Sequence, residues 1–443
     1  MPERRTCAST SSRGAAVVEA VLSPADAVAA QTARQVAHWT LAAARLNLDD
    51  LASAQAWGRL ESYLGLSIRT HLKGVVDRLA SDARVLATLQ REATSPLAQA
   101  DVRRRLLVFR SRYLRAETTL DFFADAINAR TSPELGAMLR ACDTLAHRSM
   151  TALLEPLGKT APVSLCYLDK GLGASILKAG LRLWDGGDVC PVAVIKITRH
   201  NLLRPTALIH EAGHQVAHMC GWNAELALVL SRGLVQEAGA AADLAQIWAA
   251  WASEIAADAF AFVHTGFASV AALHDVLAGD LPGVFRHVEG DPHPISYLRV
   301  LLGARMCRYF YGRQGPWETL ESAWTTLHPL DKAGSATRAV ALDSLALLDP
   351  VVRLTLDTPM KAFAGKPLRA LVAPERVGPV ALAELDARIG PALFTSPHWL
   401  WSEPLRILGL TGLKAAQDPQ RLAQILELQQ QSMLRLGGAL QAA

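Results

Sequence analysis

The sequence predicts a mainly α-helical protein that carries one small β-sheet, an α+β fold. Apolar residues make up 51% of the 443 residues and aromatic residues only 6%, so helix-favouring alanine and leucine dominate the apolar fraction. Apolar residues recur at helical spacing through residues 16–158. Between residues 162 and 198, by contrast, short runs of alternating or β-branched residues indicate strands.

Residues 16–160 are predicted to form an N-terminal helical domain, preceded by a loose, disordered tail over residues 1–15. Ser23-Pro24 and Ser132-Pro133 are helix-start signals, because serine caps a helix and proline fits its first turn. In the basic run 103–115, leucine, valine and phenylalanine are interleaved with the arginines. This pattern favours the solvated face of an amphipathic helix over a nucleic-acid or lipid site.

A sheet of three or four strands is predicted over residues 162–198. The strands are expected at 163–168, from 175 to 178, at 181–184 and at 191–198, and the last of these is rich in β-branched residues. We interpret Gly171-Leu172-Gly173 as a turn, because the rest of a phosphate-loop pattern is missing. The strand at 191–198 is expected to offer an edge along which an extended peptide can pair.

The stretch after this strand contains the pentad His210-Glu211-Ala212-Gly213-His214, a HExxH motif. On a helix, positions i and i+4 share a face, so both imidazoles can reach one ion. Glu211 is then the expected general base, acting on water activated by Zn²⁺. Thr206 or Asn201 is the expected cap of this helix, and Gly221 its expected end.

A catalytic zinc usually takes three protein ligands, and Glu254 is the best candidate for the third. It lies in an Ala-rich segment that is predicted to be a second helix, where Glu254 and Asp258 share a face as i and i+4. One carboxylate can bind the metal while Asp258 accepts the N–H of a ligand histidine. The alternative is that both carboxylates are solvated, but their neighbours are almost all apolar.

Two other positions are weaker candidates for the third ligand. A metzincin places a histidine six residues after the pentad, where this chain has Cys220, and it requires a glycine where this chain has Ala217. His218 continues the i+4 series but lies too far along a straight helix axis to share the ion.

The order of these motifs resembles that of gluzincin metallopeptidases, in which a HExxH helix precedes a helix with ExxxD. A third element, the His-Pro pair at 293–294 followed by Arg299, is similar to the HtpX-like and CAAX-prenyl-endopeptidase-like families. The resemblance covers residues 190–310 and implies a zincin-like catalytic domain over residues 161–325. By position it implies metal ligands at His210, His214 and Glu254, a base at Glu211, a second-sphere partner at Asp258, and catalytic groups at the cleft in His293 and Arg299.

The sequence also departs from these families. Many members carry long apolar helices, whereas the most apolar stretches here, 244–263 and 339–356, are interrupted by carboxylates. No membrane span is therefore expected, and prenylated or membrane substrates are not supported. Residues 326–443 are predicted to form a C-terminal helical region.

Composition limits the expected cellular location of the protein and the classes of partner it is expected to bind. The net charge of +4 is small for this length and suggests no nucleic-acid partner. The six cysteines include no CxxC pair, which is typical of reduced thiols in a cytoplasmic protein, and no apolar segment of signal-peptide length begins the chain.

The leading hypothesis from the sequence is a soluble zinc-dependent endopeptidase acting on peptide or protein substrates. The alternative is a helical interaction or regulatory protein with a catalytically inactive zincin domain.

Overall fold

The computed structural model describes residues 23–171, 174–177 and 190–439 of the chain, and this part is mainly helical, as predicted. The predicted tail at 1–15 and the predicted strand at 181–184 lie outside the described residues, as does most of the turn at 171–173. The chain divides into two compact units. The first comprises residues 1–47 and 71–117, and the second comprises residues 48–70 and 118–443.

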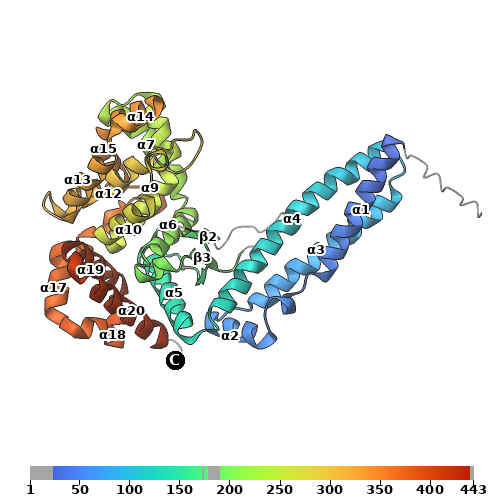
Figure 1. The fold of residues 1–443 in the computed structure, drawn as a ribbon, viewed down its shortest axis with the longest axis horizontal. Coiled ribbons are helices and arrows are strands. Elements are labelled where there is room, and N and C mark those ends of the chain that lie inside the picture. Colours follow the sequence, from blue (N-terminus) through green and yellow to red (C-terminus); the bar gives the residue numbers. More distant parts are fainter. Residues whose placement is uncertain (1–22, 172–173, 178–189, 440–443) are drawn as a thin grey trace, which may run out of the picture. The chain divides into compact units, whose positions relative to one another are not determined.

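The first unit is built from α1 (Pro24–Arg45) and from parts of α3 (Ile68–Glu92) and α4 (Pro96–Ala129) (Figure 1). Ser23 caps α1 as predicted, since its side chain accepts a hydrogen bond from the Asp26 N–H. Inside the unit the Trp39 and Tyr113 rings meet edge to face at 5.1 Å. Two arginines of the basic run, Arg104 and Arg105, pair with Asp101 on an exposed face of α4.

The second unit holds a small sheet and most of the helices. Its helices are α2 (Ala54–Leu64), α5 (Pro133–Leu154), α6 (Ala207–Cys220), α7 (Trp222–Ala238), α8 (Ala242–Ala250), α9 (Ala252–Thr265), α10 (Phe267–Leu277), α11 (Leu281–Val284), α12 (Ser296–Tyr311), α13 (Pro316–Leu327), α14 (Ser335–Leu345), α15 (Leu348–Leu356), α16 (Leu368–Leu371), α17 (Pro379–Ile389), α18 (Pro397–Ser402), α19 (Pro404–Gln417) and α20 (Leu422–Ala439).

The sheet has three described strands, β1 (Ser164–Leu168), β2 (Ser175–Leu177) and β3 (Ala193–Ile197), in the order β1-β3-β2. β1 pairs with β3 in parallel, and β2 pairs with it antiparallel. The prediction that this last strand offers a free edge is wrong. β3 is the central strand, and residues 194–196 are paired on both sides, so its main chain is not available to an added peptide.

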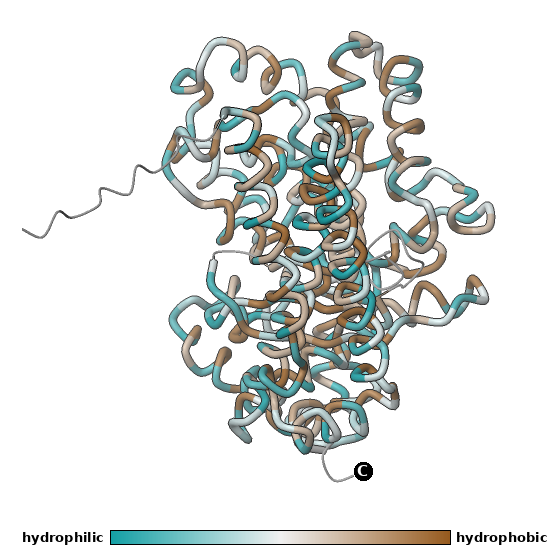
Figure 2. The backbone as a smooth tube through the Cα atoms, turned by 90° about the vertical axis from the view of Figure 1, so that its right-hand side faces the viewer, coloured by the Kyte–Doolittle hydropathy of each residue, from teal (hydrophilic) through white to brown (hydrophobic). Residues whose placement is uncertain are grey.

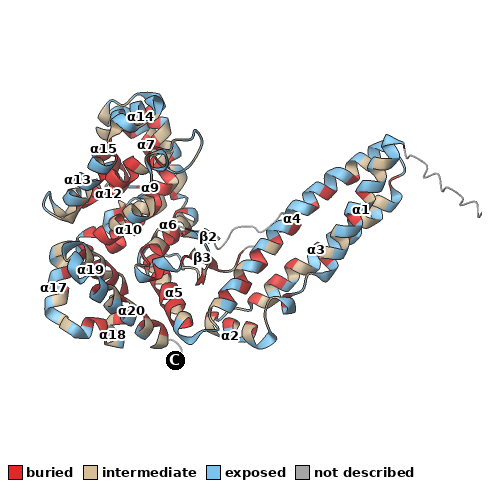
Figure 3. Ribbon diagram, in the orientation of Figure 1, coloured by how far each residue is buried: buried red, intermediate tan, exposed pale blue. Residues whose placement is uncertain are grey.

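The core of the second unit lies around α5, α6, α9 and α12, which are largely buried in Figure 3. Along most helices hydrophobic and hydrophilic residues alternate, as Figure 2 shows, so each helix presents one apolar face to its neighbours. α9 is an exception because nearly all of it is buried, including the carboxylate-bearing Glu254. A buried helix that carries acidic residues needs compensating partners for them.

α6 and α9 pack closely, and a glycine makes this possible. A Cβ atom on Gly213 would lie 3.0 Å from Ala257 Cα and 3.0 Å from Phe260 Cβ. These distances are shorter than ordinary carbon–carbon contacts of about 3.5–4.0 Å. The second variable position of the HExxH pentad, Gly213, is thus the point where α9 crosses α6.

A buried ionic network fixes α5 against β1 and its neighbours. Asp143 on α5 pairs with Arg130 at 2.6 Å and accepts hydrogen bonds from the Tyr63 hydroxyl at 2.9 Å and the Cys166 N–H at 2.6 Å. Both ionic side chains are nearly inaccessible to solvent. The network satisfies the carboxylate completely, which is the condition for tolerating a buried charge.

Within the described ranges, no helix is both long enough and apolar enough to cross a lipid bilayer.

Candidate metal centre

α6 presents its two histidines on the face that points toward α9. Leu208, Ile209, Ala212 and Val216 are fully buried and hold the helix in the core, while His210 and His214 remain slightly accessible. Their ring centroids are 4.7 Å apart, as the i, i+4 spacing requires.

The sequence predicts the C-terminal end of α6 correctly, but it does not predict the side-chain contacts at the start of the helix. Gly221 ends the helix in the left-handed conformation, with φ at 70°, as predicted. At the start, Thr206 occupies the N-cap position as predicted, but its side chain makes no capping hydrogen bond. Asn201, the other predicted cap, lies in the 3₁₀ turn His200–Leu203. Thr206 has helical φ and ψ angles, so its hydroxyl is not aimed at the first N–H groups.

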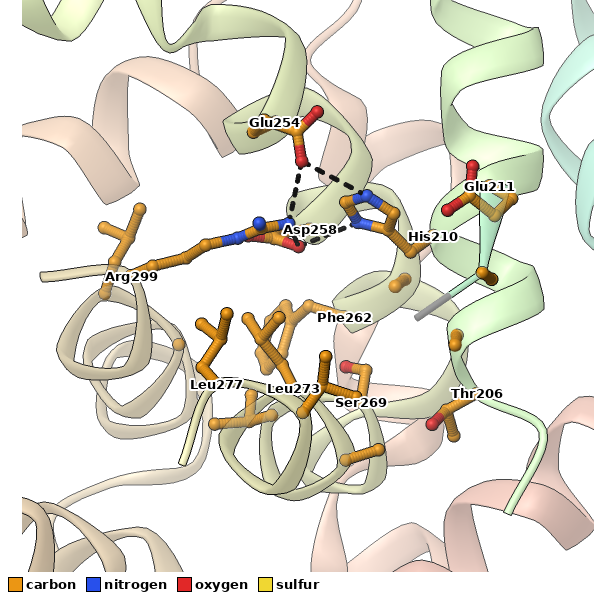
Figure 4. Close-up of a pocket in the computed structure, with 18 of the residues that line it drawn as sticks. Thr206, His210, Glu211, Glu254, Asp258, Phe262, Ser269, Leu273, Leu277 and Arg299 are labelled. Carbon is orange, nitrogen blue, oxygen red and sulfur yellow. Dashed lines mark hydrogen bonds and ion pairs between the residues drawn. The ribbon is translucent and has the colours of Figure 1, made fainter. Parts of the chain in front are cut away.

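α9 brings Glu254 to the two histidines. Its Oε2 atom lies 3.4 Å from His210 Nε2, and its Oε1 atom lies 3.2 Å from His214 Nε2. The three ligand atoms lie within 4.8 Å of one another, so this group can hold one metal ion. Figure 4 shows Glu254 and His210 facing each other across the gap between their helices.

Side chains behind the ligands fix the two rings. Asp258 Oδ1 lies 2.8 Å from His210 Nδ1, which leaves Nε2 of that ring for the metal. Ser253 Oγ lies 3.4 Å from His214 Nδ1 and itself accepts a hydrogen bond from the Asn223 amide at 3.2 Å. Each histidine therefore has an oxygen on its far nitrogen.

Arg299 joins the two carboxylates of α9. It donates from Nε to Asp258 Oδ2 at 2.6 Å and from Nη2 to Asp258 Oδ1 at 2.9 Å, and Nη2 lies 3.0 Å from Glu254 Oε2. The side chain is only 7% exposed. A bidentate contact of this kind is a strong way to hold a carboxylate in one orientation. Arg299 thus supports both acidic residues of the centre.

These contacts shift the pKa values of the metal-free centre. Burial favours the neutral His210 ring, but contacts with Asp258 and Glu254 outweigh burial and raise its pKa to about 10. Burial raises the pKa of the Glu254 carboxyl, yet His210, His214 and Arg299 together hold that pKa below its ordinary value. The centre therefore stabilises a cation where the histidine nitrogens and the carboxylates meet.

His293 lies beside the centre without being part of the ligand group. Its Nδ1 atom is 2.7 Å from Asp291 Oδ1, and its Nε2 atom is 3.9 Å from Glu254 Oε1. The ring is 61% exposed. Hydrogen bonds from the His293 main chain and ring hold the pKa of Asp291 below its ordinary value. Asp291 orients the ring so that its other nitrogen points toward the centre.

The centre opens onto a cavity of about 260 Å³. Glu211 lines this cavity together with His210, Glu254 and Arg299, and Figure 4 shows Glu211 next to His210 on α6. Glu211 is 7% exposed. Three carboxylates, from Glu211, Glu254 and Asp258, thus lie near the Arg299 guanidinium. Arg204, the other guanidinium on the cavity wall, is paired with Asp275. With neutral histidines, two carboxylate charges are therefore left over at the centre, which is the charge that one divalent cation would neutralise.

Other residues near the motifs lie elsewhere. Tyr297 packs against Phe285 at 5.3 Å and does not line the cavity. Tyr309 and Tyr311, close in sequence to the cleft, donate hydrogen bonds to Asp357 and to the Pro374 carbonyl, away from the centre.

Sequence reasoning missed two parts of the centre. Ser253 directly precedes the ligand Glu254, and a hydroxyl at that position gives no periodic or motif signal. Asn201 and Thr206 line the cavity, although the sequence suggested only capping for them. The sequence did indicate that Arg299 needs an acidic partner, because it is a lone arginine within an apolar helix segment. It did not identify Asp258 as that partner.

Comparisons of the chain with protein-family models, with curated proteins and with solved structures found no match.

Proposed function

We propose that this protein is a zinc-dependent endopeptidase of gluzincin type. The observation that carries the proposal is the convergence of His210, His214 and Glu254 from two helices, with Glu211 on the wall of the adjoining cavity. Two imidazoles and one carboxylate are a donor set of catalytic zinc sites that leave a fourth position for water.

The distances in the centre fit zinc. Zinc binds histidine nitrogen and carboxylate oxygen at about 2.0–2.2 Å in a tetrahedron, which separates neighbouring ligand atoms by roughly 3.4 Å. His210 Nε2 lies 3.4 Å from one Glu254 carboxylate oxygen, Oε2, and His214 Nε2 lies 3.2 Å from the other, Oε1. Asp258 supplies the second-sphere oxygen that ligand histidines usually contact.

The residues of the centre have distinct tasks in this proposal. When bound, zinc lowers the pKa of a water molecule and polarises the carbonyl of the bond to be cut. Glu211 would accept the proton of the attacking water and pass it to the leaving amine. Asp258 keeps the His210 ring in the tautomer that binds the ion, and Arg299 holds Glu254 and Asp258 in place.

His293 is our candidate for stabilising the oxyanion that develops on the carbonyl. Asp291 fixes its Nδ1 atom, and Nε2 is free to donate a hydrogen bond near the centre when the ring is protonated. Arg299 is less suited to this task, because its guanidinium is already engaged by two carboxylates.

The cavity favours cleavage inside a chain over removal of a C-terminal residue. A carboxypeptidase needs a cation that binds the free terminal carboxylate. Among the described residues that line the cavity, Arg204 is the cation besides Arg299 and the histidines, and it is paired with Asp275.

The test combines zinc binding with cleavage. The wild type is expected to bind one zinc ion per chain and to cut peptides of a quenched fluorescent library. His210→Ala and His214→Ala lose the zinc, whereas His218→Ala, an exposed histidine on the same helix, keeps it. Glu211→Gln keeps the zinc and loses cleavage by at least about 10²-fold, while the exposed Glu237→Gln changes neither.

Two results would contradict the proposal. One is a wild-type protein that does not bind zinc stoichiometrically at neutral pH. The other is a Glu211→Gln variant that cuts peptides as fast as the wild type.

A further inference from the structure

The cavity beside the metal centre has a wall that is almost wholly apolar. α9, α10 and α12 surround it, and Figure 4 shows side chains of α10 facing the centre across the cavity. Its apolar wall is formed by Phe262, Leu273, Val276, Leu277, Leu302 and Met306.

α10 turns two different faces to its surroundings. Phe267 and Ala268 are buried in the core, whereas Leu273, Val276 and Leu277 are only half-buried. The last three share one face at helical spacing and line the cavity. Accessible apolar surface costs about 25 cal/mol per Å², so a concave apolar wall next to a polar centre favours an apolar ligand group.

A glycine allows two of the helices that line the cavity to pack closely against each other. Gly303 on α12 and Val270 on α10 both line it, and a Cβ atom at Gly303 would lie only 2.9 Å from Val270 Cγ1. The two helices therefore approach closely at this point. The close contact fixes the positions of the apolar side chains that extend from each helix.

Two polar side chains of the cavity lining have no hydrogen-bond partner within the described residues. Asn201 and Thr206 are 8% and 3% exposed and line the cavity. Asn201 Nδ2 and Thr206 Oγ1 are buried, and neither finds a hydrogen-bond partner within the described part of the chain. A buried polar group without a partner is unfavourable, so a ligand that supplies a hydrogen bond here is favoured.

An apolar wall on one side and unpaired polar groups on the other match the two parts of an amino-acid residue. We propose that the cavity receives one large apolar side chain, of leucine, methionine or phenylalanine size, from the residue next to the bond that is cut. Asn201 and Thr206 hydrogen bond to the peptide group of that residue. This inference rests on the proposed function and names its substrate class. The volume of about 260 Å³ suits one large side chain and lies below the range typical of sites for drug-sized ligands.

The first experiment measures binding and does not depend on catalysis. Two hydroxamates, which chelate zinc, are titrated into the zinc-loaded protein by calorimetry. Glycine hydroxamate carries no side chain, and leucine hydroxamate differs from it only by an isobutyl side chain. Burial of that side chain is expected to tighten binding about 10- to 100-fold. Ala272→Phe, which fills the cavity from α10, should remove most of this difference and leave glycine hydroxamate binding unchanged.

Control variants distinguish filling of the cavity from the general effects of a substitution on binding and stability. Ala224→Phe adds the same bulk at an exposed position of α7 and should leave both hydroxamates unaffected. Thr206→Val removes a hydroxyl that has no partner, so the stability of the free protein should stay the same or rise. The same variant should weaken binding of leucine hydroxamate about 5- to 10-fold when that ligand is extended by a peptide group.

The outcomes distinguish this inference from the proposed function. Equal affinity for both hydroxamates overturns the inference, even if the protein cuts peptides. A strong preference for leucine hydroxamate that Ala272→Phe abolishes supports it, even if no peptide is cut, in which case the peptidase proposal alone fails. A protein that binds no zinc overturns both. In an active protein, the cleavage profile should favour large apolar residues next to the cut bond, and Ala272→Phe should shift it toward alanine.

Discussion

Gly213→Ala is the sharpest test of how the fold builds the metal centre. The variant adds one methyl group between α6 and α9, at the position directly before His214. That methyl carbon would lie 3.0 Å from Ala257 Cα, 3.0 Å from Phe260 Cβ and 3.2 Å from the Ala257 carbonyl oxygen. None of these atoms can move by a side-chain rotation, so the helices themselves must separate.

The size of the effect follows from these distances. Ordinary carbon–carbon contacts lie at about 3.5–4.0 Å, so α6 must shift from α9 by roughly 0.5–1 Å. Overpacking of this kind costs typically about 1–3 kcal/mol, and the better helix propensity of alanine returns about 1 kcal/mol. Metal sites tolerate ligand displacements of about 0.2 Å. We therefore expect a modest loss of stability and a larger loss of zinc affinity, at least about tenfold.

The assay pairs urea unfolding of the metal-free protein with zinc competition against a chromophoric chelator. Gly58→Ala is the matched control, because it lies within a helix, α2, and a Cβ there meets no atom within 4 Å. That control should raise stability by about 0.5–1 kcal/mol and leave zinc affinity unchanged. Wild-type zinc affinity in Gly213→Ala would refute the reasoning, since the ligands would then not depend on the close crossing of α6 and α9.

Two further predictions concern charge in the centre. In the metal-free protein the pKa of His210 is raised from 6.5 to about 10, so protonated His210 stabilises the fold fully below about pH 6.5. This contribution is lost as the pH rises toward 10, with a slope of up to about 1.4 kcal/mol per pH unit, and a flat urea-unfolding profile between pH 6.5 and 9.5 would contradict it. Arg299→Gln removes the cation that holds Glu254 and Asp258 and should destabilise the metal-free protein by about 3–5 kcal/mol. Arg299→Lys should lose less stability than Arg299→Gln. An equal urea midpoint for Arg299→Gln and the wild type would argue against this role of Arg299.

Much of the centre was predictable because its parts repeat at short sequence distances. The i, i+4 spacing of His210 and His214, and of Glu254 and Asp258, places each pair on one helical face wherever the helix lies. The strong helical periodicity around both pairs made the helices themselves predictable. The three strands were also expected near their observed positions, since β-branched runs seldom form helices.

Two predictions failed, wholly or in part, because they depended on residues outside the local segment: the free edge of β3 and the capping hydrogen bond of Thr206. The strand ending at Ile197 has the pattern of a strand but not of an edge strand or a central one, because pairing with β1 and β2 involves residues 17–29 positions away. Thr206 has the side chain of a helix cap, but its backbone angles, set by the preceding turn, direct its hydroxyl elsewhere.

The order of residues alone places two imidazoles on one helical turn and two carboxylates on another, in a mainly helical chain around a small sheet. The packing of the helices establishes that Glu254 faces both rings, that Arg299 bridges the acidic pair, and that an apolar cavity adjoins them. The difference arises because helix periodicity depends on neighbouring residues. The distance between two helices instead depends on how their apolar faces and a single glycine pack.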